Sequence, residues 1–341
     1  MRYQQILFTG VGKAELLEKD LDAPGYGCVL LKMEYTAVSS GTERDNLLGK
    51  PNTYRGGFPR TLGYSGVGRV EAVGEGVKGF AVNDRAIVIW SFHASRCVVK
   101  EEQLVKIDDD TIPSAEAAFV FIASFPLAGL RKTRLEIGEP VLIQGLGILG
   151  IFAVQLARLS GGLPVIASDL QLNRRELALR LGADFAFDPA AGDYTALVKK
   201  ASSGGIKAVG GVKAAIEVSG NSLALKQVLE CCAPMARVAL LGCTRVSDTA
   251  IDFYQLVHKP GISLIGAHTN ARPEKESYPH HWSHRDDCAA LLRMLSAKRL
   301  DIKSIVSEIH RPEEAPELYR RLAEDTRFPP GVAFDWTAVN M

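Results

Sequence analysis

The sequence predicts an α/β protein in which a small all-β barrel precedes a doubly wound parallel sheet. Residues 1 to about 110 contain short runs rich in Val, Ile and Leu, bounded by Gly, Pro, Asn and Asp. From about residue 122 to 268, apolar runs of strand length alternate with segments of helical length. Repeated alternation of this kind is typical of a parallel sheet covered by helices. A chain of 341 residues is also long enough for about two domains.

The barrel is predicted from three runs with strand composition, Cys28–Met33, Gly68–Val73 and Arg85–Ile89. The stretch GVGRVEAVGEGVKGF, which includes the second run, is rich in glycine. Such a pattern is typical of strands joined by tight turns rather than of helix.

The alternating half yields a series of expected strands with helices between most of them. The expected strands are PVLIQ, PVIASD, ADFAFD, KAAIEVSG, ARVALLG and SLIGAH, and the clearest helices are LGIFAVQLARLS and LNRRELALRLGA. The tail adds a helix at about 284–297 and a strand, GVAFDW. We therefore expect a discontinuous domain of residues 1–121 and 269–341, and a second domain of residues 122–268.

Composition excludes several classes of protein. Lys plus Arg is 40 and Asp plus Glu is 39, so a net charge of +1 provides no footprint for nucleic acid or an anionic membrane surface. The apolar segment 140–157 barely reaches the length of a membrane span and contains glycines, so we expect a buried strand that runs into a buried helix. The six cysteines form no Cys-x-x-Cys pair and no export signal is visible, which favours the cytoplasm.

A glycine-rich loop between an expected strand and an expected helix predicts dinucleotide binding. Gly145, Gly147 and Gly150 fit G-x-G-x-x-G, where the glycines permit a tight turn, close approach of the pyrophosphate and helix–sheet packing. The backbone N–H groups of Ile148 and Leu149 would then bind phosphate at the start of the helix. Asp169 lies 19 residues after Gly150 and should bind the ribose hydroxyls, which favours NAD. Arg174 and Arg175 follow closely, so NADP stays open.

The order of these segments resembles the medium-chain dehydrogenase/reductase family of zinc-type alcohol and polyol dehydrogenases. The stretch GYSGVGRVEAVGEGVKGFAVNDR is similar to that family's signature, and SDLQLNRRELALRLGAD is similar to a segment of its polyol branch. The resemblance implies a GroES-like barrel, a Rossmann NAD(P)-binding domain and a homodimer or homotetramer paired through the SLIGAH region. It also implies cofactor contacts in the segments that contain the following residues: Ser219, Leu241, Gly242, Ala267 and Thr269.

The chain departs from this family at the zinc ligands. The expected Cys, His-Glu pair and third ligand are replaced by Ser39, by Tyr64-Ser65 and by a segment from 119 to 130 without Cys, His, Asp or Glu. Hydroxyls are poor zinc ligands, so we expect a zinc-independent member. One cluster, formed by His280, His281, His284 and Cys288, has spacings that would suit a metal. The alternative is a helix start with Asp286 and Asp287 in its first turn.

Without zinc, a side chain must handle the proton on the substrate oxygen. Tyr64 takes the position of a histidine ligand and would be an acid or hydrogen-bond donor, the alternative being a packed barrel tyrosine. Glu43, on an expected loop, would be a base or bind a substrate hydroxyl, unless it forms a surface ion pair with Arg44 or Arg131. His93 would be a proton shuttle or a structural histidine, and Ser39 a hydrogen-bond donor in the former metal position.

The sequence therefore predicts a zinc-independent NAD(P)-dependent oxidoreductase that interconverts an alcohol and a carbonyl, on a small molecule such as a sugar or cyclitol. The first alternative is an enone or quinone reductase of the same family. The second is a nicotinamide-binding protein without catalysis. No nucleic-acid or membrane partner is expected.

Overall fold

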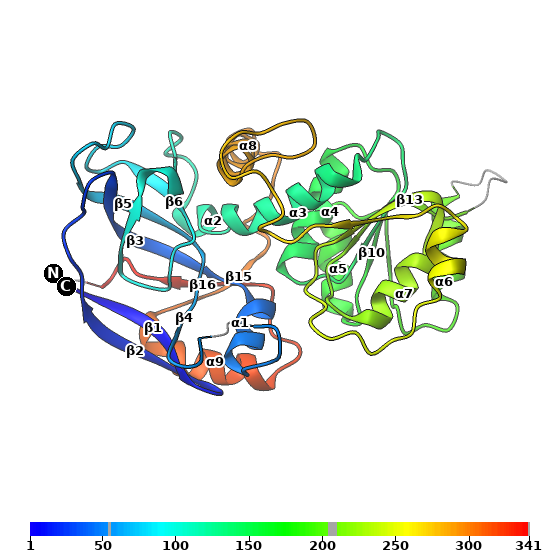
Figure 1. Cartoon of the computed structure of the whole chain (residues 1–341), viewed down its shortest axis with the longest axis horizontal. Helices are drawn as coiled ribbons and strands as arrows, with labels where there is room; N and C mark the ends of the chain where they lie inside the picture. Colours follow the sequence, from blue (N-terminus) through cyan, green and yellow to red (C-terminus); the bar gives the residue numbers. More distant parts are fainter. Residues whose placement is uncertain (54–55, 204–209, 340–341) are drawn as a thin grey trace. The chain divides into compact units, whose positions relative to one another are not determined.

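A computed structural model describes residues 1–53, 56–203 and 210–339, and these form two compact units (Figure 1). Unit 1 consists of Met1–Ile122 and His284–Met341, and unit 2 consists of Ala123–Ser283. Helix α3 (Val120–Thr133) contains the first boundary between them.

Unit 1 is built on β-sheets. A seven-stranded sheet has the order β15-β16-β3-β5-β6-β8, with β7 paired to β3, and a smaller sheet has the order β2-β1-β4. The strands of unit 1 are β1 (Arg2–Gly10), β2 (Lys13–Asp20), β3 (Cys28–Val38), β4 (Arg60–Thr61), β5 (Ser65–Val73), β6 (Arg85–Ile89), β7 (Arg96–Lys100), β8 (Leu104–Lys106), β15 (Val306–His310) and β16 (Gly331–Asp335).

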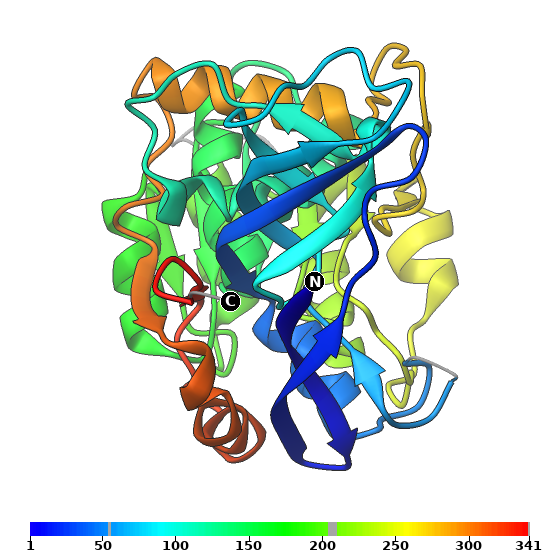
Figure 2. The same cartoon turned by 90° about the vertical axis from the view of Figure 1, so that its left-hand side faces the viewer.

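The remaining elements of unit 1 are helices at its edges. They are α1 (Ser40–Leu47), η1 (Glu101–Gln103), α2 (Ser114–Ala117), α8 (His284–Ser296), η3 (Pro312–Glu314) and α9 (Ala315–Glu324). Figure 2 shows α9 beside the β1–β2 hairpin. Its residues Ala315, Leu318, Tyr319 and Leu322 recur at helical spacing and are buried in the core of the unit.

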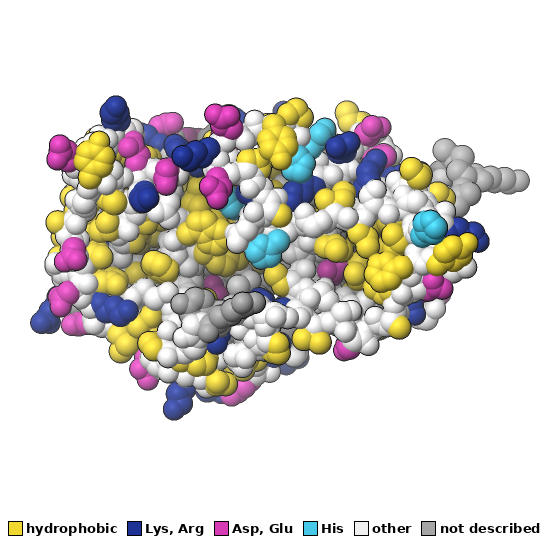
Figure 3. Space-filling model, in the orientation of Figure 1, with side chains coloured by type: hydrophobic (Ala, Val, Ile, Leu, Met, Phe, Trp, Pro, Cys, Tyr) yellow, Lys and Arg dark blue, Asp and Glu magenta, His cyan; other side chains and the backbone are white. Residues whose placement is uncertain are grey.

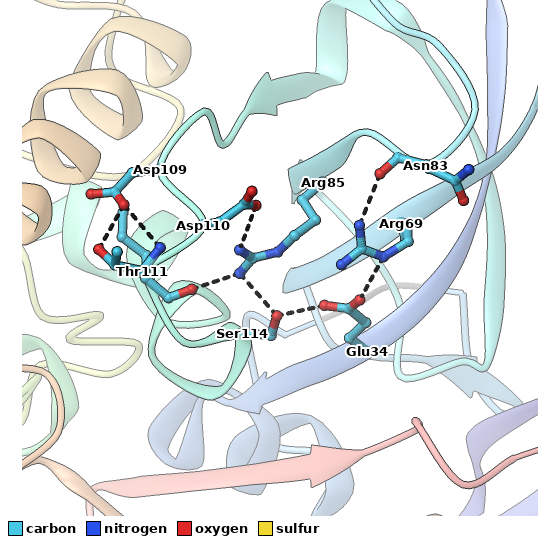
Figure 4. A network of polar contacts seen from close by, with 9 residues as sticks. Glu34, Arg69, Asn83, Arg85, Asp109, Asp110, Thr111 and Ser114 are labelled. Atoms are coloured by element: carbon cyan, nitrogen blue, oxygen red, sulfur yellow. Dashed lines mark hydrogen bonds and ion pairs between the residues drawn. The ribbon is translucent and has the colours of Figure 1, made fainter.

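A polar network holds the segment after β8 against the sheet (Figure 4). The buried Arg85 donates through Nη2 to the carbonyl of Ile112 at 2.7 Å and to Ser114 Oγ at 3.0 Å. Ser114 in turn donates to Glu34, which also accepts from Arg69 Nε at 3.2 Å. Arg85 therefore ties β6 to the start of α2.

Unit 2 is a parallel sheet with helices packed on it. Its order is β11-β10-β9-β12-β13-β14, and every pairing is parallel. Its strands are β9 (Val141–Gln144), β10 (Val165–Ser168), β11 (Phe185–Phe187), β12 (Val212–Glu217), β13 (Cys232–Leu240) and β14 (Ser263–Gly266). Its helices are α4 (Ile148–Leu159), α5 (Leu172–Arg180), α6 (Tyr194–Ser202), α7 (Ser222–Cys231) and the π-helical turn η2 (Tyr254–His258). The predicted fold class, a barrel-type unit with a doubly wound parallel sheet, is confirmed.

The second domain boundary differs from the expected one. Residues 269–283 belong to unit 2 rather than to unit 1. The reason is local packing, because Lys132 donates to the carbonyl of Ala271, Arg272 donates to the carbonyl of Ser124 at 2.9 Å, and the Arg131 guanidinium lies 3.7 Å from the centre of the Trp282 ring. No sequence pattern in 269–283 signals these contacts.

Segment 140–157 forms β9, the glycine-rich loop and most of α4, as expected. Within the described ranges, none of the helices has both the length and the apolar character needed to cross a membrane. Figure 3 shows side chains of both charge signs interspersed over the face that it presents.

Candidate functional site

The predicted cofactor residues of unit 2 lie together at the carboxyl ends of its strands. Gly145 follows β9, Asp169 follows β10 and Ser219 comes shortly after β12. Leu241 and Gly242 follow β13, and Ala267 and Thr269 follow β14, so five strands contribute to one edge. The chain order reverses between β9 and β12, where ligands bind in sheets of this kind.

The glycine loop is closely packed at two of its three glycines and open at the third. Gly145 has φ +96°, and a Cβ there would lie 2.9 Å from Ser219 N. A Cβ on Gly150 would lie 1.9 Å from the Gly145 carbonyl oxygen, so the helix packs directly on the loop. In contrast, a Cβ on Gly147 would meet no atom within 4 Å. Gly147 precedes Ile148 and Leu149, the first residues of α4, whose N–H groups begin the helix.

Asp169 forms hydrogen bonds with backbone groups of the glycine loop and of its own turn. Its carboxylate accepts from Leu146 N and from Gln171 N, both at 2.8 Å, and Arg174 Nη1 lies 3.8 Å from it. Arg175 donates to the Asp169 carbonyl at 2.7 Å. Asp169 therefore connects β10 to the glycine loop, with one cationic neighbour on its carboxylate, which sequence reasoning did not foresee.

A buried carboxylate, Glu217, lies at the end of β12 and connects the segments that follow β12 and β13. Its Oε1 accepts from Ser219 N at 2.8 Å and from the Ser219 hydroxyl, and its carbonyl accepts from Leu241 N and Gly242 N. Burial raises the pKa of the Glu217 carboxyl, and the hydrogen bonds from Ser219 and Gly220 oppose that shift. Glu217 was not predicted, although its position at the end of a predicted strand is a signal that could have found it.

These residues fit a dinucleotide. A Cβ on Gly147 would stand in open space, where a phosphate could approach the backbone, and the buried Thr269 Oγ1 has no hydrogen-bond partner among the described residues. Unit 2 therefore brings backbone N–H groups, one carboxylate and a hydroxyl to the carboxyl edge of its sheet.

In unit 1, Tyr64 lies just before β5 and is half-buried among aromatic rings. Its hydroxyl donates to Ser39 Oγ. Its ring centre lies 5.8 Å from that of Trp90 and 6.1 Å from that of Phe121, and both rings also contact His284. Trp90 keeps 37% of its surface exposed, so this aromatic cluster (Tyr64, Trp90, Phe121 and His284) is partly open. Tyr64 is thus a predicted catalytic residue whose hydroxyl belongs to a half-buried side chain next to an exposed ring.

Glu43 lies elsewhere than expected. It belongs to helix α1 rather than to a loop, and its side chain has no exposed area, so the surface ion pair with Arg44 or Arg131 is wrong. Its carboxylate accepts from Ser39 N at 2.8 Å, from the Tyr319 hydroxyl at 2.6 Å and from His93 Nε2 at 3.2 Å. A carboxylate enclosed in this way cannot reach a substrate directly, so the expected base or substrate-binding role does not fit this geometry.

His93 is also internal. It is 1% exposed, its Nδ1 lies 2.8 Å from Thr36 Oγ1, and Thr36 Oγ1 accepts from Trp336 Nε1 at 2.9 Å. Gly63, with φ +88°, allows the chain before Tyr64 to pass against His93, because a Cβ there would lie 2.7 Å from His93 N. The structural alternative therefore describes His93 better than a solvent-linked shuttle does. Sequence reasoning missed Thr36, Tyr319 and Trp336, which are distant in sequence.

The positions that the resemblance assigns to zinc ligands hold no thiolate, imidazole or carboxylate, the groups that zinc prefers. They offer hydroxyls that are already engaged, since Tyr64 donates to Ser39 and Ser65 Oγ donates to the Ala118 carbonyl at 2.5 Å. No group of three or more His, Cys, Asp or Glu side chains that could hold a metal is found within the described ranges. In the alternative cluster, His284 and Cys288 lie on α8, and His280 and His281 precede that helix.

Two family models match the chain, an alcohol dehydrogenase GroES-like domain over residues 25–119 and a zinc-binding dehydrogenase over residues 149–284. The L-threonine 3-dehydrogenase of Pyrococcus horikoshii is 28% identical over 339 residues, covering 90% of this chain and 92% of the relative. The L-threonine 3-dehydrogenase of Anaeromyxobacter dehalogenans is 30% identical over 242 residues, covering 62% of this chain and 67% of the relative.

A solved protein of Sinorhizobium meliloti 1021, bound to NADP, has a TM-score of 0.80 at 23% identity, covering 98% of this chain and 99% of that one. That likeness shows the fold, and the sequence matches extend over both units. The chain therefore belongs to the medium-chain dehydrogenase/reductase family of zinc-type alcohol dehydrogenases, and it is an NAD(P)-dependent dehydrogenase.

Proposed function

We propose that this chain transfers hydride between a nicotinamide and an alcohol or carbonyl carbon without a catalytic zinc ion, and that Tyr64 handles the proton on the substrate oxygen. The observation that supports this is the donor set of unit 1. The zinc-ligand positions hold Ser39, Tyr64 and Ser65, and Glu43 and His93 are enclosed in the interior.

A bound nicotinamide supplies the hydride in carbonyl reduction and takes it in alcohol oxidation. In reduction, the Tyr64 O–H turns from Ser39 Oγ to the substrate oxygen and donates its proton as negative charge develops there, and the Ser39 hydroxyl then donates its own hydrogen to the Tyr64 phenolate that is left. In oxidation the same proton returns to Tyr64. A positioned acid of this kind accelerates the reaction by about 10²–10⁴-fold.

For the cofactor, Gly147, Ile148 and Leu149 would bind the pyrophosphate and Asp169 the adenosine ribose. The Asp169 carboxylate repels a 2′-phosphate, which favours NAD. Arg174 at 3.8 Å reduces that repulsion, so NADP is the second cofactor to test. The proposed substrate is a sugar or cyclitol alcohol.

The aromatic cluster favours a second candidate function. Trp90 and Phe121 give Tyr64 an apolar border, which suits a flat conjugated molecule better than a polyol. The second candidate is therefore a reductase of enones or quinones. Assays with sorbitol, inositol, cyclohexenone and benzoquinone separate the two, because only the first candidate oxidises the alcohols.

The test of the main proposal combines metal content with one substitution. Chelator-washed protein should contain zinc well below one atom per chain by elemental mass spectrometry and keep its activity. Tyr64→Phe should lower kcat by about 10²-fold or more. Tyr35→Phe is the matched control, since its hydroxyl donates to Asp335 at 3.2 Å in the same unit, and it should stay near wild type.

Zinc near one atom per chain, with activity lost on chelation, would overturn the zinc-independent mechanism. Full activity of Tyr64→Phe would overturn the role of Tyr64. Cofactor binding without turnover on any compound of the panel would favour a nicotinamide-binding protein without catalysis.

A further inference from the structure

Unit 1 contains a buried hydrogen-bond network that begins at Trp336, directly after β16, and ends at Tyr64. It consists of Trp336, Thr36, His93, Glu43, Tyr319, Ser39 and Tyr64. All but Tyr64 are buried. Burying these polar groups costs free energy unless each donor and acceptor is paired. The pairing of each group is therefore followed below.

The donors and acceptors fix the direction of the network. The Trp336 indole only donates, so Thr36 Oγ1 accepts from it and has its own proton available for His93 Nδ1. His93 Nε2 then carries the ring proton and donates it to Glu43. This single tautomer satisfies all four groups.

Glu43 is the point at which this network meets the proposed acid. Three donors converge on its carboxylate, Tyr319 Oη at 2.6 Å, His93 Nε2 at 3.2 Å and Ser39 N at 2.8 Å. Glu43 Oε1 thereby fixes the backbone of Ser39, whose side chain accepts the proton of the Tyr64 hydroxyl. Burial, followed by the nearby Glu43 charge, raises the pKa of Tyr319 well above its ordinary value, so Tyr319 stays a neutral donor.

We propose that Tyr319 is a positioning residue for catalysis, which acts through Glu43 and Ser39 to hold the Tyr64 hydroxyl in its working orientation. The proposal rests on the proposed function of Tyr64. Tyr319 lies 276 residues from Glu43 in sequence, and its ring also packs edge-on against Phe8 at 4.8 Å. Tyr319→Phe would keep that ring and remove only the hydroxyl.

The first test is kinetic, with whichever compound of the panel is turned over. Tyr319→Phe should lower kcat about tenfold or more, while KM and the dissociation constant for NAD change less than about twofold. Tyr35→Phe removes a comparable tyrosine–carboxylate hydrogen bond between β3 and β16 and should change none of the three. Thr36→Val, which removes the hydroxyl between Trp336 and His93, should reproduce the loss of kcat from the far end of the network.

A double substitution separates positioning from stability. If Tyr319 acts through Tyr64, Tyr319→Phe should add little to the loss already caused by Tyr64→Phe. Losses that multiply in the double variant would overturn the positioning role, even if Tyr64 is the acid. Full activity of Tyr64→Phe would instead show that the proposed function itself is wrong.

A second readout needs no turnover. In protein labelled with ¹³C at tyrosine Cζ, the Tyr64 resonance is assigned by its absence in Tyr64→Phe. It should move in Tyr319→Phe and stay in place in Tyr35→Phe. An unmoved Tyr64 resonance, or an unchanged kcat, in a folded Tyr319→Phe protein would overturn the proposal.

Discussion

At the scale of single residues, two glycines of the same loop have different physical roles. Gly150 and Gly147 belong to the same loop, yet a Cβ on the first would lie 1.9 Å from the Gly145 carbonyl oxygen and a Cβ on the second would meet nothing. Gly150 is therefore required by helix packing, whereas nothing in the described structure requires a glycine at position 147, and we propose that a bound pyrophosphate does. The motif therefore combines a residue needed for helix packing with a residue that leaves space for a ligand.

We expect Gly147→Ala to fold normally and to bind cofactor poorly. Its melting temperature should match wild type, because the added methyl group enters open space, while the dissociation constant for NAD should rise tenfold or more as the methyl group blocks the pyrophosphate. Gly150→Ala should melt several degrees lower, since overpacking costs about 1–3 kcal/mol. Differential scanning fluorimetry and calorimetric titration measure both. Equal affinities of Gly147→Ala and wild type would show that the phosphate does not bind there.

At the scale of elements, the connection from β6 to α2 depends on one buried guanidinium. Arg85 holds the carbonyl of Ile112 and the hydroxyl of Ser114, whereas Arg69 forms a more exposed ion pair with Glu34. We therefore expect the arginine at position 85 to contribute more to the free energy of unfolding than the arginine at position 69 (Figure 4).

Arg85→Lys should lower the free energy of unfolding by about 1–3 kcal/mol, because a lysine cannot reproduce the two hydrogen bonds made by one planar nitrogen and leaves a buried acceptor unpaired. Arg69→Lys should cost less than about 1 kcal/mol. Urea unfolding of both variants gives the comparison. Similar losses would mean that the burial of Arg85 does not decide its contribution.

The elements of unit 2 were predictable because each is specified locally. PVLIQ, PVIASD and ARVALLG are apolar runs bounded by turns, and they form β9, β10 and part of β13. The choice of Tyr64 as the candidate acid rests on its position within a glycine-rich signature, and its bond to Ser39 and its aromatic neighbours come from the structure. The Glu43–Tyr319 contact was not predictable, because it joins α1 to α9 across most of the chain and neither segment signals its partner. The buried helical spacing of α9 was a usable signal that sequence reasoning passed over.

At the scale of the whole molecule, β14 is one of the two edge strands of the sheet in unit 2, the other being β11. An edge strand offers unpaired N–H and C=O groups to a second chain. We propose that the chain assembles as a homodimer or homotetramer through the β14 edge.

Light scattering should accordingly give a mass two or four times that of the chain. Hydrogen exchange of the peptide that contains β14 should accelerate on dilution, as the partner dissociates, while exchange at the central β9 stays constant. A monomer at every concentration would exclude the proposed assembly.

The discontinuity of unit 1 has a consequence for the protein's biosynthesis. Unit 2 is continuous in sequence, so it is complete on the ribosome before residues 284–341 have been made. During this time the first 122 residues lack β16, which pairs with β3. They also lack Trp336, whose backbone N–H donates to the carbonyl of Glu34. The cofactor-binding unit can therefore mature on the nascent chain, whereas the surroundings of Tyr64 are completed only when the segment that contains Tyr319 and Trp336 has been translated.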